Sequence, residues 1–293
     1  MRKHFFLCAA IAVVLCACGN NEPTADSNGV LKGKFSVSAN TQVQFSQGNL
    51  LYQASTNTWK FAENQWDFVG DATSGTVIEN AKKCDNAKIS TSYVGWIDLF
   101  GWGTGNAPTK SSKEKKDYSN FADWGTNAIS NGGNKANVWR TLTNDEWGYL
   151  IYTRPNSATL FGFGSVNEVN GLILLPDNWK LPNGASFTAS TTQGLAYADG
   201  YYYNSNGKNY SHNTYTIEQW SKMEAAGAVF LPCVGYREGI EVSSVVADGG
   251  YWSATLDDTE DVCIAHYFHF STYRLNPQDN FVCNRGRAVR LVR

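Results

Sequence analysis

Charge of either sign is scarce in this chain, and neither sign dominates. Only 17% of the 293 residues are charged, and 24 basic residues stand against 26 acidic ones. Proteins that bind nucleic acid need a basic face that neutralises phosphates, so this balance argues against nucleic acid as a partner. Beyond the N-terminal segment, no apolar run approaches the length that crosses a bilayer. We therefore expect the remainder of the chain to fold outside the membrane.

Closely spaced metal ligands are also lacking. Four of the seven cysteines lie beyond the N-terminal segment, at positions Cys84, Cys233, Cys263 and Cys283. None stands in a CxxC pair or near a histidine at zinc-finger spacing, so we predict neither a metal site nor a cofactor. Four cysteines allow three disulfide pairings, which the sequence cannot separate. Free buried thiols are the alternative.

Aromatic and neutral polar residues are abundant instead. Aromatic residues make up 14% of the chain, with 10 tryptophans, and hydrophobic residues make up 42%. Glycine, asparagine, serine and threonine fill much of the remainder. This composition is typical of a secreted protein that is rich in strands and loops and has enough apolar residues for a sizeable core.

The N-terminal segment resembles the signal sequence of bacterial lipoproteins. A short basic start precedes the uncharged apolar run Phe5–Leu15, which suits a signal peptide but is too short for a finished membrane anchor. The run ends in Leu15-Cys16-Ala17-Cys18, similar to the lipobox, in which the chain is cut before an acylated cysteine. The resemblance implies a signal peptide over residues 1–17, lipidation of Cys18, and anchoring in the outer membrane at the surface of a Gram-negative cell. Cys16 is a rival acceptor, and a plain secretory signal or a buried helix is the alternative.

Residues 19–29, which make up most of the segment 18–32, are mainly polar and contain turn formers. Such a segment buries too little apolar surface to offset its chain entropy, so we expect a flexible tether. A single domain over residues 33–293 should follow, with an insertion-rich first half. The orientation of the lipoprotein, periplasmic or external, stays open.

Period-two alternation of apolar and polar residues predicts strands near both ends of this domain. In the first part we expect strands over 34–38 and 43–46, then a hairpin formed by 50–52 and 59–61. In the last third we expect strands over 228–232, 235–237, 250–255, 264–270 and 288–292. A buried strand is expected over 172–176, a loop over 200–213, and irregular structure over 70–133.

Two helices are predicted from capping boxes, in which the first residue and the residue three positions later satisfy each other's free backbone donors. The first begins after Thr143, with Glu146 as its partner, and the second begins after Thr216, with Gln219 as its partner. Gly227 is placed to end the second helix as a C-cap.

Several motifs occur in one order over residues 139–293. They are Trp139–Trp147, Ile173–Pro176, Phe230–Pro232, Gly235–Arg237, Gly250–Thr255 and Arg285–Val292. This order resembles bacterial surface proteins with a C-type-lectin-like fold, which is distantly related to the formylglycine-generating-enzyme fold. The resemblance implies an α+β fold in which two helices flank a small, twisted, mostly antiparallel sheet.

The chemistry of the better-known branches does not transfer well. The Trp-Asn-Asp triplet of the calcium-dependent lectins is absent, and Asp177-Asn178-Trp179 runs in the reverse order. Calcium needs six to eight oxygen ligands, and no matching acidic cluster is visible. The oxidase branch needs a reactive cysteine pair. Cys233 and Cys283 could be proposed for this role, but neither stands in that enzyme's motif.

A second branch fits better, namely the variable proteins of diversity-generating retroelements. In that branch a few exposed positions near the C-terminus are diversified while the framework is kept. Along 263–270, alternation places Ile264, His266, Phe268 and Phe270 against the core and leaves Cys263, Ala265, Tyr267 and His269 exposed. Because His266 and His269 then lie on opposite faces, they should not form a metal pair. Ordinary loop residues are the alternative to a diversified face.

We therefore expect a non-enzymatic, lipid-anchored surface protein that binds a carbohydrate or protein ligand through its C-terminal strands and loops. Tyr, His, Trp, Ser and Asn offer contact area and adaptable hydrogen bonds at low ordering cost. A structural or adhesive component of a surface assembly, using the first half, is the alternative, and an oxidase is the least favoured. The predicted ligand-binding residues are Trp252, Thr255, Asp257, Asp258, Asp261, Cys263, Tyr267, His269, Ser271, Thr272, Tyr273, Arg274, Asn280, Phe281 and Asn284.

Overall fold

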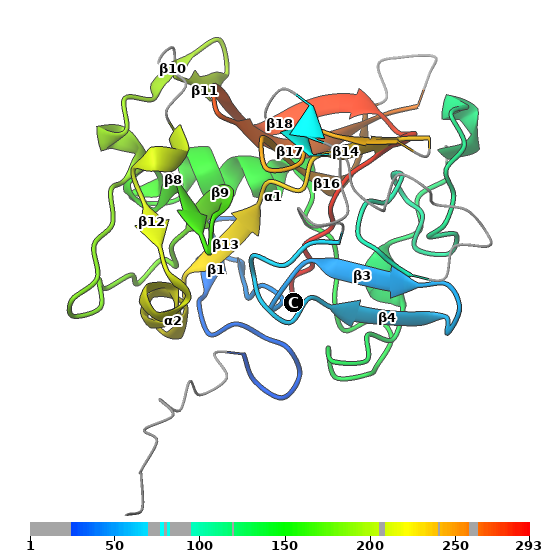
Figure 1. Cartoon of the computed structure of the whole chain (residues 1–293), viewed down its shortest axis with the longest axis horizontal. Coiled ribbons are helices and arrows are strands. Elements are labelled where there is room, and N and C mark those ends of the chain that lie inside the picture. Colours follow the sequence, from blue (N-terminus) through cyan, green and yellow to red (C-terminus); the bar gives the residue numbers. More distant parts are fainter. Residues whose placement is uncertain are drawn as a thin grey trace, which may run out of the picture.

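The structure is a computed structural model that describes most of the chain (Figure 1). The described residues are 25–69, 77–78, 81–82, 95–118, 120–204, 209–239, 241–257 and 263–293. Within these residues two α-helices accompany many short strands, so the expected α+β class is confirmed. The predicted lipidation residue Cys18 lies outside the described residues. In the described part, no helix has the length and apolar character needed to span a bilayer.

The C-terminal strands form a five-stranded antiparallel sheet in the order β10-β11-β18-β17-β16. Its strands are β10 (Ala196–Ala198), β11 (Tyr201–Tyr203), β16 (Asp248–Asp257), β17 (Ile264–Ser271) and β18 (Arg274–Val282). The predicted strands over 250–255 and 264–270 are confirmed within β16 and β17.

Two parts of this sheet differ from the sequence prediction. The expected loop over 200–213 is wrong at its start, because Tyr201–Tyr203 pairs with β10 and with β18. Strand β18 was not expected at all, since its residue types show no alternation and it contains Pro277. The pairing register of β17 and β18 shifts between Tyr267 and His269, where Pro277 lies opposite. Proline lacks a backbone donor, and a bulge in the ladder accommodates it.

A second sheet of four strands has the order β12-β8-β9-β13. Its strands are β8 (Phe161–Val166), β9 (Val169–Leu174), β12 (Thr214–Tyr215) and β13 (Val229–Pro232). Helix α2 (Ile217–Ala225) packs against this sheet, with the rings of Trp220 and Phe230 5.6 Å apart. The predicted capping box of Thr216 and Gln219 is confirmed. Gly227 follows the helix with φ +102°, a conformation that favours glycine, as the predicted C-cap requires.

Helix α1 (Asn144–Gly148) begins at the predicted capping box of Thr143 and Glu146 and continues as one turn of π-helix, η4 (Tyr149–Thr153). The fully buried Trp147 ring lies 4.8 Å from the Phe268 ring of β17. This helix therefore covers the core-facing side of the C-terminal sheet (Figure 1).

The first part of the chain forms small sheets and turns. Its strands are β1 (Phe35–Ser36), β2 (Gln42–Val43), β3 (Leu50–Gln53), β4 (Thr58–Phe61), β5 (Val77–Ile78), β6 (Ala81–Lys82) and β7 (Trp96–Ile97). The predicted hairpin is confirmed as β3 and β4, whereas β1 and β2 are shorter than the expected strands. A further three-stranded sheet joins β15 (Glu241–Ser243), β14 (Tyr236–Glu238) and β19 (Arg285–Gly286). Short 3₁₀-helices occur at Lys115–Tyr118, Trp124–Thr126, Ser157–Thr159, Ser190–Thr192 and Asn209–Ser211.

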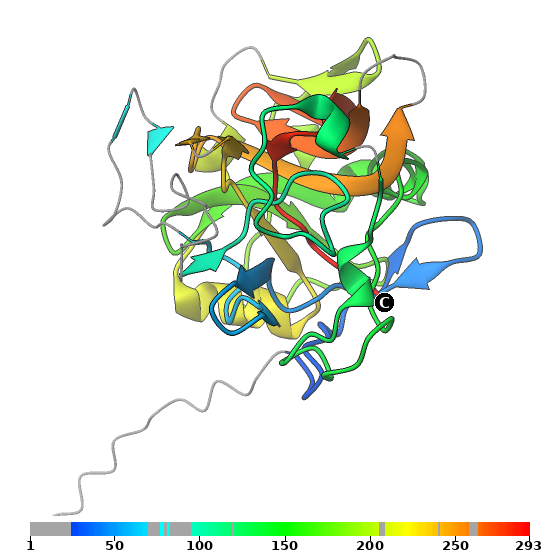
Figure 2. The same cartoon turned by 90° about the vertical axis from the view of Figure 1, so that its right-hand side faces the viewer.

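The C-terminal segment pairs with earlier parts of the chain. Residue Phe45 bridges to Val292, and Val292 also bridges to Arg140. The expected strand over 288–292 is present only as such isolated bridges. At the N-terminal side, Ala25 bridges to Leu31, and Val30 and Leu31 are buried. The expectation of a flexible tether through residue 32 is therefore wrong for residues 25–32, which belong to the folded body (Figure 2).

The first half of the chain packs directly against the C-terminal sheet. Residues Phe100, Trp102 and Tyr118 share one hydrophobic cluster with Trp252 and Tyr267 of the C-terminal sheet. The indole of Trp252 donates to the Phe100 carbonyl at 2.6 Å, and that of Trp102 donates to the Ser253 carbonyl at 2.9 Å. The first half thus covers part of the face of the C-terminal sheet that alternation alone leaves exposed.

Candidate functional site

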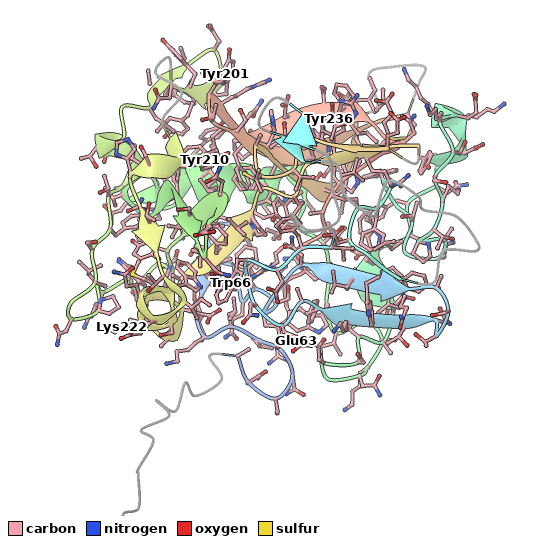
Figure 3. The ribbon with its side chains drawn as sticks, viewed as in Figure 1. Glu63, Trp66, Tyr201, Tyr210, Lys222 and Tyr236 are labelled. Carbon is pink, nitrogen blue, oxygen red and sulfur yellow. A yellow bond between two sulfur atoms is a disulfide. The ribbon has the colours of Figure 1, made fainter. Side chains whose placement is uncertain are left out.

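An open pocket of about 490 Å³ lies where the C-terminal sheet meets β14 and β19. We call it the arginine pocket. Figure 1 shows β14 beside β16, β17 and β18, and Figure 3 marks Tyr236 at this place. The lining residues are Tyr236, Asp248, Tyr267, His269, Arg274, Asp279, Asn280, Phe281, Arg285 and Arg287.

Strand alternation explains how these side chains converge. Tyr267 and His269 lie two residues apart on β17, and Asp279 is the partner of Tyr267 on β18. Residues Arg285 and Arg287 also lie two positions apart, so they point to the same side of the chain. Gly250 on β16 leaves room for Arg287, because a Cβ at that glycine would lie 2.3 Å from Nη1 of the arginine.

One histidine is held between two carboxylates. Nδ1 of His269 lies 3.0 Å from Oδ2 of Asp279, and Nε2 lies 3.1 Å from Oδ2 of Asp248. Carboxylates only accept hydrogen bonds, so this geometry favours a proton on both ring nitrogens. Burial opposes the charged form of all three groups, but their mutual hydrogen bonds outweigh it. The pKa of His269 is raised above its usual 6.5, and the pKa values of Asp248 and Asp279 are lowered below their usual 3.8.

Arg287 is buried at the wall of the pocket with few polar partners. Its side chain is 3% exposed, and its guanidinium carbon lies 3.5 Å from the centre of the Tyr267 ring. The nearest carboxylate oxygen, Oδ1 of Asp248, is 3.9 Å from Nη1, beyond hydrogen-bonding distance. Both Nε and Nη1 of this arginine, and Oδ1 of Asp248, are buried without a hydrogen bond.

Two further arginines stand at the rim. Arg285 lies 4.3 Å from the Tyr236 ring and 4.1 Å from the Phe281 ring, and it pairs with Glu238 at 3.1 Å. Arg274 pairs with Asp279 at 3.3 Å and lies 4.5 Å from the Tyr201 ring. With His269 protonated, four cationic side chains line the pocket against two carboxylates. The pocket is therefore positively charged.

The structure brings five of the predicted ligand-binding residues into this pocket, namely Tyr267, His269, Arg274, Asn280 and Phe281. Three more lie where β17 meets β18: Ser271 is the last residue of β17, and Thr272 and Tyr273 form the turn, with Tyr273 61% exposed. Asp258 and Asp261 lie outside the described residues. Asp257 accepts a hydrogen bond from Asn280 at 2.7 Å, close to the pocket but not in its lining.

Other predicted site residues have structural roles instead. Trp252 is buried in the core, and the hydroxyl of Thr255 accepts a hydrogen bond from the backbone of Asn144 at 3.0 Å. Asn284 is buried and donates to the carbonyl of Lys113 at 2.8 Å. The expectation that these residues contact ligand is wrong for Trp252 and Asn284, because the first half of the chain covers them.

The expected exposed face of β17 is also wrong in part. Ala265 and Tyr267 are buried, although Tyr267 still lines the pocket. The predicted separation of the two histidines holds in the structure, since His266 faces Asp257 at 3.9 Å while His269 lines the pocket. Among the described residues, no group of three His, Cys, Asp or Glu side chains is placed to hold a metal ion.

One cysteine pairing that the sequence left open is now determined. Cys263 and Cys283 form a disulfide between the start of β17 and the end of β18, so Cys263 cannot contact ligand as a free thiol. Cys233 is free and buried, and its thiol donates to the Tyr210 hydroxyl at 3.1 Å. Burial raises the pKa of this thiol far above its usual value. Cys84 lies outside the described residues.

Sequence reasoning missed half of the pocket lining. The missed residues are Tyr236, Asp248, Asp279, Arg285 and Arg287. The spacing of Arg285 and Arg287 was the available signal, because two arginines separated by one glycine in an extended segment share a side. The partners of His269 come from two other strands, and only the pairing register reveals them.

No family model matches this chain, and no curated protein or solved structure matches it either.

Proposed function

We propose that this chain is a lipid-anchored protein of the cell surface that binds a ligand through the C-terminal sheet of a C-type-lectin-like domain. The observation that carries the proposal is the arginine pocket, where charged and aromatic side chains from five separate strands converge without forming a metal site. Small-molecule sites in proteins have volumes of about 300–1,000 Å³, with a few well-placed polar groups. Two helices beside a mostly antiparallel sheet agree with the fold class that the sequence resemblance implies.

A role in binding rather than catalysis is supported by the state of the reactive groups. Both nitrogens of His269 are engaged by carboxylates, so the ring has no free position for accepting a substrate proton. The oxidase alternative needs a reactive cysteine pair, whereas Cys283 is in a disulfide and Cys233 is buried with a raised thiol pKa.

The alternative of an assembly protein that uses its first half is less well supported. In the described part of that half, Trp102, Tyr118 and Trp124 are buried against the rest of the domain and offer no contact surface. The exposed aromatic side chains beside the pocket are Phe281 and Tyr273.

The binding proposal is tested by screening the purified protein on arrays of immobilised glycans and proteins. Binding to a hit should be lost in Phe281→Ala, whose side chain lines the pocket and is 37% exposed. It should persist in Tyr197→Ala, a matched exposed aromatic on β10 outside the pocket. Equal binding by both variants, with folding intact, would place the ligand elsewhere and contradict the proposal.

The lipid anchor has a separate test. We expect the wild-type chain to incorporate labelled fatty acid and a Cys18→Ala variant to incorporate none, because the acceptor of the lipid is then missing. Equal incorporation in the variant would contradict lipidation at Cys18.

We also propose that the exposed part of this face is diversified. It comprises the turn Ser271–Arg274 together with Asn280 and Phe281 at the rim. Sequencing the flanking DNA in several isolates should reveal a reverse transcriptase and a near-copy of the codons for 250–293. Identical sequences in all isolates, with neither feature, would leave a fixed binding face.

A further inference from the structure

The buried arginines of this protein fall into two kinds. Arg237 is satisfied by the fold, since its Nε, Nη1 and Nη2 donate to the carbonyls of Leu99, Gly239 and Lys110 at 3.1, 2.7 and 3.0 Å. Arg154 and Arg290 each donate two hydrogen bonds to protein groups. The arginines that support the fold therefore donate hydrogen bonds to acceptors within the protein.

Arg287 is the exception among these buried arginines. Its Nε and Nη1 atoms are buried without a hydrogen bond to any described residue, although a guanidinium carries five donors. Buried polar groups without partners are uncommon in proteins, because each costs free energy when it loses water. The side chain is nonetheless fixed in place by the Tyr267 ring, the Asp248 carboxylate and the space above Gly250. A guanidinium that is held in place at a pocket wall but lacks hydrogen-bond acceptors indicates that a ligand supplies them.

The neighbours of Arg287 indicate the charge of that acceptor. Both carboxylates of the pocket are directed at His269, which leaves Arg287 without a carboxylate at hydrogen-bonding distance. Arg285 pairs with Glu238 at 3.1 Å, outside the pocket lining. The Nε atoms of Arg274 and Arg285 are also buried without a hydrogen bond. Arginine forks match carboxylates in geometry and form strong charge-assisted pairs with them.

A second set of groups indicates what the anion is attached to. Acceptors lie beside the cations, namely Asp279, Asn280 and the unsatisfied oxygen of Asp248. A multiply charged anion would be repelled by the two carboxylates, whereas hydroxyl groups can donate to them. The exposed Phe281 ring supplies an apolar edge at the rim.

We propose that the arginine pocket binds a sugar acid, in which a hydroxyl-bearing ring carries one carboxylate that pairs with Arg287 and its neighbours. This inference rests on the proposed binding function and names its ligand class. The carboxylate accepts hydrogen bonds from Arg287 and Arg285, and ring hydroxyls donate hydrogen bonds to the aspartates. An acidic peptide shares the carboxylate but lacks the hydroxyls, so it should bind more weakly.

The test measures the affinity of the purified protein for three probes: an oligosaccharide that contains glucuronate, the same oligosaccharide with glucose at that position, and a glutamate-rich peptide. We expect the glucuronate probe to bind about tenfold or more tightly than the other two, because only this probe offers both a carboxylate for the arginine and hydroxyl groups for the aspartates. Equal binding of the neutral sugar, or tighter binding of the peptide, would overturn the ligand class and leave the binding function intact.

Two arginine variants connect the affinity to the pocket. Arg274→Gln removes a pocket arginine that is 38% exposed and paired with Asp279, and Arg140→Gln removes a matched arginine, 40% exposed and paired with Glu146, outside the pocket. Binding of glucuronate should weaken about tenfold in the first and stay unchanged in the second. Arg287→Gln should abolish binding, with circular dichroism as the check on folding. If all variants bind every probe as the wild type does, the pocket is not the site and the proposed function fails as well.

Discussion

The two faces of strand β17 are stabilised in different ways. On one face Phe268 and Phe270 are fully buried in a hydrophobic cluster with Trp147 and Leu275. On the other face Tyr267 and His269 meet Arg287 and two aspartates. The first face depends on apolar burial, which is insensitive to pH, and the second depends on charges that compensate each other. One strand therefore separates the part that holds the fold from the part that is available for binding.

The largest expected effect comes from truncating the apolar face. Phe268→Ala should lower the free energy of unfolding by about 3–5 kcal/mol, because it removes a fully buried ring and leaves a cavity. Phe281→Ala, on the pocket side, should lower it by about 1 kcal/mol or less. Urea denaturation of both variants measures the difference. Similar losses in the two variants would show that the faces do not differ in this way.

A smaller effect is expected at the edge that joins the two faces. The disulfide of Cys263 and Cys283 closes a hairpin with a sequence separation of 20. Replacing both residues with Ala should destabilise the protein by about 3 kcal/mol, because the unfolded chain gains entropy. A reducing agent should lower the melting temperature of the wild type and leave that of the double variant unchanged. A wild type that is insensitive to reduction would contradict the pairing.

The smallest effect, and the most specific for the pocket face, is on the pH dependence of stability. The raised pKa of His269 gives a stabilisation that is complete below about 6.5 and is lost as the pH rises through its folded pKa. The lowered pKa values of Asp248 and Asp279 give a stabilisation present above about 3.8 and lost as the pH falls through their folded values. The charged or titratable neighbours of these three groups are Arg274, Arg285, Arg287 and Tyr267.

Stability should therefore be greatest between these limits and decline toward alkaline pH. In His269→Gln the alkaline decline should disappear, whereas Tyr273→Ala, which changes an exposed residue on the adjacent turn, should keep the wild-type profile. Thermal melting from pH 5 to 9 provides the measurement. An alkaline decline of equal size in His269→Gln would assign it to other groups.

Local signals in the sequence predict the local structure well. Both capping boxes depend on residues within a few positions of each other, and the structure contains them as predicted. The alternation of β17 correctly places Phe268 and Phe270 in the core, but it is wrong for Ala265 and Tyr267, which are buried. Strand β18 could not be predicted in this way, because a bulge at Pro277 interrupts its periodicity. The burial of Trp252 and Asn284 could not be predicted from local sequence either. Phe100 and Lys113, which cover them, lie more than 140 positions away in sequence.

In the candidate site, too, local sequence predicts part of the arrangement and long-range packing determines the rest. Alternation assigns Tyr267 and His269 to one side of β17, yet the acidic partners of the histidine come from β16 and β18 through the pairing register. Composition gives no sign that Arg287 lacks acceptors, because Arg237 and Arg290 have the same side chain and a full or partial set of them. Only the packed structure distinguishes an arginine that supports the fold from one that is available to bind a ligand.

The folded start of the described chain determines how such a protein would stand on a membrane. Residues 25–32 are packed at one end of the molecule, and β17 and β18 lie at the opposite end in both views (Figures 1 and 2). A lipid on Cys18 would then be separated from this fixed point by only a few residues. On the proposed lipidation, the membrane would lie close beneath one pole of the domain, and the arginine pocket would face away from the membrane.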